Sequence, residues 1–144
     1  MNKSLVLYLL FCGGMTGIIA LSHTVSLAQK SETAHESKAT IEGLVRDIAC
    51  PMQNPEASAT HLSMKCLRAC VKAGSPLVIL TKDGELCLPI SDKMPDTDQR
   101  QNLTLFLGKY VRASGTVYER KGTHAIAISK IEELKDVHLQ IEDQ

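Results

Sequence analysis

An apolar run from Leu5 to Leu21 opens the chain and limits how much of it can form a folded domain. Lys3 precedes the run and Ser26-Leu27-Ala28 follows it, which together make the three-part pattern of a cleavable secretory signal over residues 1–28. A permanent membrane anchor is the alternative. Cys12 follows large apolar residues in the middle of the run, which argues against attachment of a lipid.

Cleavage at this point leaves residues 29–144, which is the size of one domain with a single core. The whole chain has a formal net charge of zero, and loss of Lys3 changes it by only one unit. Such a chain has no field that would hold nucleic acid or an anionic membrane. We therefore expect a periplasmic or secreted protein with no stable membrane insertion after cleavage.

Hydrophobic spacing predicts the elements of this domain. Residues 29–39 are polar without periodicity and predict a flexible tether, so that the fold begins at Thr40. Period-two alternation then predicts a strand over residues 40–48. A helix follows a Pro-containing segment, with Ser63 as its N-terminal cap and Gly74 at its C-terminal end.

Two hairpins follow the helix. Residues 77–80 and 86–90 predict the first hairpin, and residues 110–119 and 124–131 predict the second. Helical spacing over residues 100–107 places a short helix between them. The acidic tail, residues 132–144, can form either a frayed helix or a short extra strand through Val137, Leu139 and Ile141.

This order predicts a mainly β (α+β) domain over residues 40–131. Five strands, a helical cysteine-bearing insertion after the first strand, and a short helix between the third and fourth strands match a small OB-like Greek-key barrel. A strand-rich α+β sandwich is the main competing architecture. OB folds often bind single-stranded nucleic acid through stacked aromatic residues, but residues 29–144 contain no Trp and few other aromatic residues. The sequence therefore argues against a nucleic-acid partner.

A resemblance supports this fold. Residues 41–131 resemble a group of small, largely uncharacterised exported bacterial proteins with OB-like domains. The likeness is carried by Gly43, Asp47, Cys50, His61, Cys66, Cys70, Gly74, Pro76, Leu77, Asp83, Gly84, Gly108, Lys109, Val111 and Gly115. It implies an OB-like fold and a cluster of Asp47, Cys50, His61, Cys66 and Cys70, and it brings no established activity. Cys87 stands where an aromatic or aliphatic strand residue is expected, so we hold it apart from this cluster.

Cys66 and Cys70 are four residues apart on the expected helix and share one face. Their Cβ atoms would lie about 5–6 Å apart, whereas a disulfide needs about 3.5–4.5 Å. Either cysteine can instead bridge to Cys50, or both thiolates can hold one metal ion. His61 can join the same site only if the helix begins near Ser63.

Three functions stay open for the cluster. The first is a non-catalytic binding module for a small ligand or an envelope protein, with Cys50 bonded to Cys66 or Cys70, and Cys87 bonded to the remaining cysteine or free. The second is a Zn(II) or Cu(I) site formed by Cys50, His61, Cys66 and Cys70, with Asp47 as a further ligand or holding His61 in place. The third is a thiol redox protein or thiol enzyme. We favour the first function.

Overall fold

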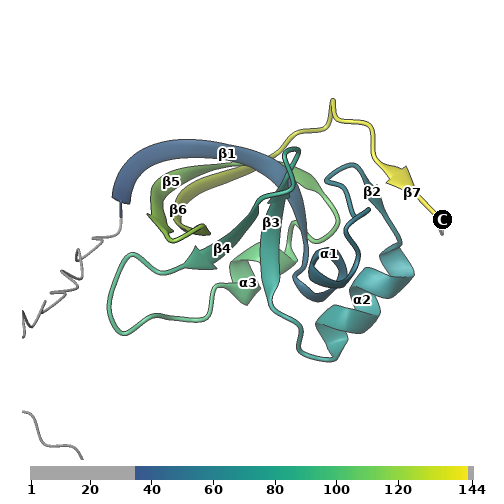
Figure 1. Ribbon diagram of the computed structural model, residues 1–144, viewed down its shortest axis with the longest axis horizontal. Helices are drawn as coiled ribbons and strands as arrows, with labels where there is room; N and C mark the ends of the chain where they lie inside the picture. The colour runs from purple at the N-terminus through teal and green to yellow at the C-terminus, as the bar shows by residue number, and fades with distance from the viewer. Residues whose placement is uncertain (1–34, 143–144) are drawn as a thin grey trace, which may run out of the picture. The chain divides into compact units, whose positions relative to one another are not determined.

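The computed structural model describes residues 35–142 of the chain (Figure 1). The signal peptide predicted over residues 1–28 and the first part of the predicted tether, residues 29–34, lie outside this range. No helix of residues 35–142 is long and apolar enough to span a membrane.

Five strands form one mixed sheet that closes on itself. They are β1 (His35–Asp47), β3 (Leu77–Thr81), β4 (Leu86–Ile90), β5 (Tyr110–Arg120) and β6 (Thr123–Glu133). The order is β1-β3-β4-β6-β5, with β5 paired back to β1, and the neighbours are antiparallel except for the parallel pair of β4 and β6. The expectation of a mainly β domain with a five-stranded, barrel-like sheet is confirmed, and so are both predicted hairpins.

β1 is the longest strand and curves along the wall of the barrel (Figure 1). Its residues 35–44 pair with β5, and its residues 43–47 pair with β3. The prediction that residues 29–39 form a flexible tether was therefore wrong for residues 35–39. His35, Glu36 and Lys38 are polar residues at exposed positions of this strand, and Lys38 Nζ donates a 2.6 Å hydrogen bond to Thr116 Oγ1 on β5. The folded domain starts at His35 rather than at Thr40.

The helical insertion between β1 and β3 contains α2 (Met64–Lys72), which has the ends that the sequence predicts. Ser63 caps it, because the Ser63 side chain accepts a 3.1 Å hydrogen bond from the Cys66 N–H. Beyond its C-terminus Gly74 has a φ of 96°, a conformation that side chains with a Cβ rarely adopt. The later helix, α3 (Arg100–Thr104), is shorter than the predicted span 100–107 and continues as turns.

Three short elements of the structure were not predicted from the sequence. α1 (Ala49–Gln53) begins immediately after β1, and β2 (His61–Leu62) precedes α2. β7 (Gln140–Ile141) lies in the tail and pairs in parallel with β2. The tail therefore takes the strand alternative, and its first two residues continue β6, so the folded domain extends beyond residue 131.

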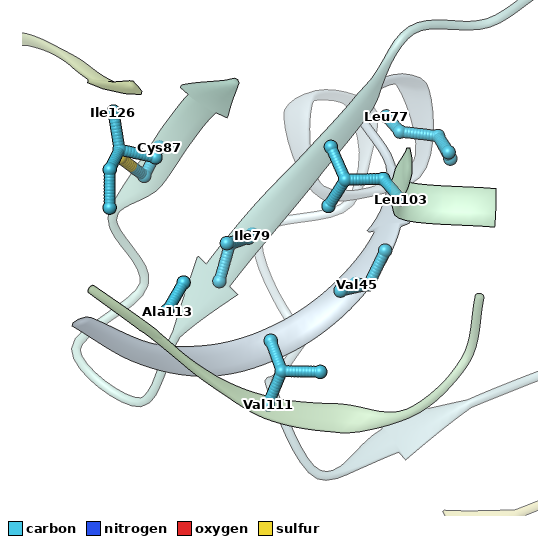
Figure 2. Packing of buried hydrophobic residues seen from close by; sticks show 8 residues of the cluster. All are labelled: Val45, Leu77, Ile79, Cys87, Leu103, Val111, Ala113 and Ile126. Carbon is cyan, nitrogen blue, oxygen red and sulfur yellow. The ribbon is translucent and has the colours of Figure 1, made fainter. Parts of the chain in front are cut away.

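The domain has two hydrophobic clusters that meet at β1. The first fills the barrel and comprises Val45, Leu77, Ile79, Cys87, Leu103, Val111, Ala113 and Ile126 (Figure 2). The second lies between the barrel and the insertion and comprises Leu44, Ala59, Leu62, Leu67, Leu80 and Tyr110. Leu44 and Val45 are adjacent and both fully buried, because the insertion covers the face of β1 that points away from the barrel interior.

Candidate functional site

A pocket of about 440 Å³ lies in the helical insertion, where α1, α2, β2 and β7 gather beside the barrel (Figure 1). We call it the insertion pocket. The chemically active residues among those that line it are Arg46, Cys50, Glu56, His61, Cys66 and Glu142. Three of the five residues of the predicted cluster, Cys50, His61 and Cys66, therefore line one pocket, although they come from three different elements.

Cys50 reaches the pocket from α1, and Asp47 holds the start of this helix. The Cys50 N–H donates a 2.9 Å hydrogen bond to Asp47 Oδ2. Pro51 is accommodated because it lies in the first turn, where its missing N–H leaves no helical hydrogen bond unmade. Asp47 itself is fully buried and lies outside the pocket lining, so its role in the structure is to anchor α1.

His61 stands at the edge of the pocket on β2. Its Nε2 lies 3.1 Å from Glu142 Oε1, and both side chains are about half exposed to solvent. The helix does begin after His61, at Met64, which is the condition under which the sequence allowed His61 to join the cluster. The imidazole is nevertheless engaged by the carboxylate of the tail.

Cys66 and Cys70 occupy successive turns of α2, and they differ in their surroundings. Cys66 is exposed and lines the pocket, whereas Cys70 is half-buried and does not. Burial raises the pKa of Cys70 to about 11, helped by the negative charge of Asp47 and by the Cys66 side chain next to it. Cys70 is therefore a protonated thiol at neutral pH, with Asp47 and Cys66 as its neighbours.

The structure thus divides the predicted cluster between the pocket and the buried side of α2. Within residues 35–142, no three His, Cys, Asp or Glu side chains are placed so that they could hold one metal ion. The cysteines at positions 50, 66, 70 and 87 are all free thiols here. Neither the metal site nor the bridge from Cys50 is present as a formed group, and both stay predictions.

Cys87 lies apart from the other cysteines, as its place in the sequence predicted. It is a buried member of the barrel cluster, to which Ile126 of the neighbouring strand β6 also belongs (Figure 2). Burial, assisted by the charge of Glu85, raises the pKa of Cys87 to about 12. Its environment is that of an apolar core residue, in which the thiol form is strongly favoured.

Arg46 is a site residue that the sequence did not predict. Only 4% of its surface is exposed, it lines the insertion pocket, and its buried Nε has no hydrogen-bond partner. Its position in the alternation of β1 predicted an exposed side chain on the outer face. No signal in the sequence shows that the insertion folds over this face and buries the guanidinium.

Comparison of the chain with protein-family models, with curated proteins and with solved structures finds no match.

Proposed function

We propose that this protein is an exported, non-catalytic binding module on an OB-like barrel, with its ligand site in the insertion pocket. We further propose that a disulfide between Cys50 and Cys66 staples α1 to α2 in the oxidising compartment outside the cytoplasm. The observation that carries the proposal is the convergence of Cys50, His61 and Cys66 on one pocket.

The topology of the barrel supports an OB-like assignment. A five-stranded OB barrel is a Greek-key sheet in which the first strand contacts both the second and the fourth. β1 pairs with β3 and β5 in this way, and the parallel pair of β4 and β6 joins the two halves. α3 lies between the third and fourth barrel strands, and its Leu103 packs into the barrel core.

Cys66 is the better partner for Cys50 in a staple. Both thiols line the insertion pocket, whereas Cys70 is turned toward Asp47. A bridge between Cys66 and Cys70 would have to strain α2, because cysteines four apart in a helix have Cβ atoms about 5–6 Å apart.

The state of Cys70 favours binding over thiol catalysis. A reactive cysteine needs a lowered pKa, as provided by a cationic neighbour or the N-terminus of a helix. Burial and the carboxylate of Asp47 do the opposite at Cys70. Cys70 therefore lacks the activation that a redox or nucleophilic cysteine requires.

The test is a cysteine map of the protein produced with its signal and purified from the periplasm of a bacterial host. The denatured protein is alkylated with and without reductant, and its intact mass is compared under native and denaturing conditions. We expect Cys50 and Cys66 to alkylate only after reduction, and Cys70 and Cys87 to alkylate without it. The Cys66→Ala variant should release Cys50 for labelling, whereas Cys70→Ala should leave the staple intact.

The opposite outcome would favour the metal-binding alternative. In that case Cys50, Cys66 and Cys70 alkylate without reductant, and the native mass exceeds the denatured mass by one metal ion. Loss of that ion in His61→Ala would then assign the site to Cys50, His61, Cys66 and Cys70 with Zn(II) or Cu(I).

A further inference from the structure

The insertion pocket contains a buried positive charge that has no partner among residues 35–142. Arg46 is 4% exposed, and its Nε has no hydrogen bond. No acidic side chain in the described part of the chain forms an ion pair with it, although Arg100 pairs with Asp98 and Arg112 pairs with Glu42 at the surface. Its neighbour in the sequence, Asp47, forms no ion pair with it: Asp47 Oδ2 accepts from the backbone of α1, and the buried Oδ1 has no hydrogen-bond partner.

An unpaired buried guanidinium is costly for a folded protein. Removing a charge from water costs several kcal/mol even after relaxation, and natural proteins offset this cost with an opposite charge and hydrogen bonds. The guanidinium cannot escape the cost by losing its proton, because arginine side chains stay protonated in proteins. A partner other than the described residues is the remaining way to satisfy Arg46, and the pocket provides the access.

We propose that the insertion pocket binds a small oxyanion, a carboxylate or phosphate group, with Arg46 as the principal binding residue. This inference rests on the proposed binding function and names its ligand class. The planar guanidinium presents parallel N–H donors that match the two oxygens of a carboxylate or a phosphate. A volume of about 440 Å³ lies at the small end of ligand pockets, which measure about 300–1,000 Å³, so the ligand is of metabolite size.

The surroundings of Arg46 are consistent with this ligand class. Ser63 and Cys66 belong to the start of α2 and line the same pocket, so the positive end of the helix dipole lies at the site. Two acids line the pocket, and one of them, Glu142, already has a partner because its Oε1 lies 3.1 Å from His61 Nε2. The other, Glu56, forms no ion pair within residues 35–142 and would repel an anionic ligand.

The test is a titration of the isotope-labelled protein, freed of its signal, with inorganic phosphate and separately with succinate at constant ionic strength. Nuclear magnetic resonance observes the Arg46 Nε–H and the backbone of α1 and α2. We expect these signals to shift saturably with at least one of the two probes, and the stronger probe identifies the phosphate or the carboxylate as the preferred group. The absence of saturable shifts with both probes would overturn the proposal.

Three variants separate binding by Arg46 from general charge effects. Arg46→Gln should weaken binding by about tenfold to a hundredfold, the loss expected for hydrogen bonds to a charged group. Glu56→Gln should strengthen it by roughly twofold or more because a like charge is removed. Arg112→Gln is the matched control on the exposed side of the barrel and should leave the affinity unchanged. An equal loss in both arginine variants would overturn the proposal.

A stability measurement keeps the test decisive if Arg46 has a structural role. Without ligand, Arg46→Met should unfold at a higher temperature than the wild type, since it removes an unpaired buried charge while keeping the volume. Its unfolding temperature should no longer rise with the probe that binds the wild type. If Glu56 were the true partner of Arg46, Arg46→Met and Glu56→Gln would both unfold at lower temperatures, and the proposal would fail.

The same samples separate this proposal from the proposed staple. Saturable binding at Arg46 together with free Cys50 and Cys66 would remove the staple and keep the anion site. An intact staple with no shift at Arg46 would remove the anion site and keep the stapled module.

Discussion

Replacement of Leu67 by alanine tests whether α2 is held on the barrel as the structure shows. Leu67 is 1% exposed and is the one α2 residue that is fully buried, in contact with the cluster between the barrel and the insertion. Leucine-to-alanine changes in protein cores cost about 2–5 kcal/mol, and the cost is larger where the site cannot collapse. Leu44 and Leu80 form the opposite wall from paired strands of a closed sheet, so little collapse is available.

We therefore expect Leu67→Ala to lower the free energy of unfolding by about 3–4 kcal/mol. Urea unfolding followed by circular dichroism measures this loss, and the thermal midpoint should fall by more than about 10 °C for a domain of this size. Leu105→Ala is the control, because Leu105 is 74% exposed. It should change stability by less than about 0.5 kcal/mol. A loss below about 1 kcal/mol in Leu67→Ala would refute the packing of α2 on the barrel and, with it, the wall of the insertion pocket.

Three further measurements test other parts of the structure. Gly115→Ala should destabilise the domain by about 2 kcal/mol or more, because the added Cβ would collide with the backbone of Ala127 at the bulge between β5 and β6. An unchanged midpoint of urea unfolding would contradict this close contact. In the reduced protein at pH 8, iodoacetamide should modify Cys70 about a hundredfold more slowly than the exposed Cys66, because a pKa of about 11 leaves little of Cys70 as thiolate. Equal rates of modification would contradict the burial of Cys70. The free energy of unfolding should fall as the pH rises from 9 toward 12, because the folded state raises the pKa of Cys87 to about 12 whereas the unfolded chain lets this thiol ionise earlier. The free energy of unfolding of Cys87→Val should fall less steeply over this range, and identical slopes would contradict the burial of the Cys87 thiol.

Much of the barrel could be predicted from the sequence because β1, β4 and β5 carry apolar residues at every second position and β3 is a continuous apolar run. The same is true of α2, whose ends are marked by Ser63 and Gly74. Residues 35–39 could not be predicted as a strand because they are held by backbone hydrogen bonds to β5 and have polar side chains on their exposed positions. β2 and β7 could not be predicted because each has only two residues, and their pairing depends on a contact between distant parts of the chain.

The candidate site was predictable in its cysteines and not in its charge. The spacing of Cys66 and Cys70 on a helix, and the Pro-containing segment after Cys50, predicted that these residues could approach one another. Cys50 and Cys66 do line the same pocket, but Cys70 is turned away from it. Arg46 was not predicted as a site residue because its burial depends on the insertion folding over β1. No local sequence pattern indicates that contact.

The pairing of β2 with β7 has a consequence for the order in which the domain is completed. The Gln140 N–H donates to the Thr60 carbonyl oxygen at 2.7 Å, and the Glu142 N–H donates to the Leu62 carbonyl oxygen at 3.2 Å. These contacts join residues about 80 positions apart, so they depend on a part of the chain that is synthesised well after β2. In a chain emerging from the ribosome, residues 140–142 appear after β1, β3, β4, β5 and β6, so the barrel can form before β2 has its parallel partner. The wall of the insertion pocket that Glu142 forms is then added after the barrel.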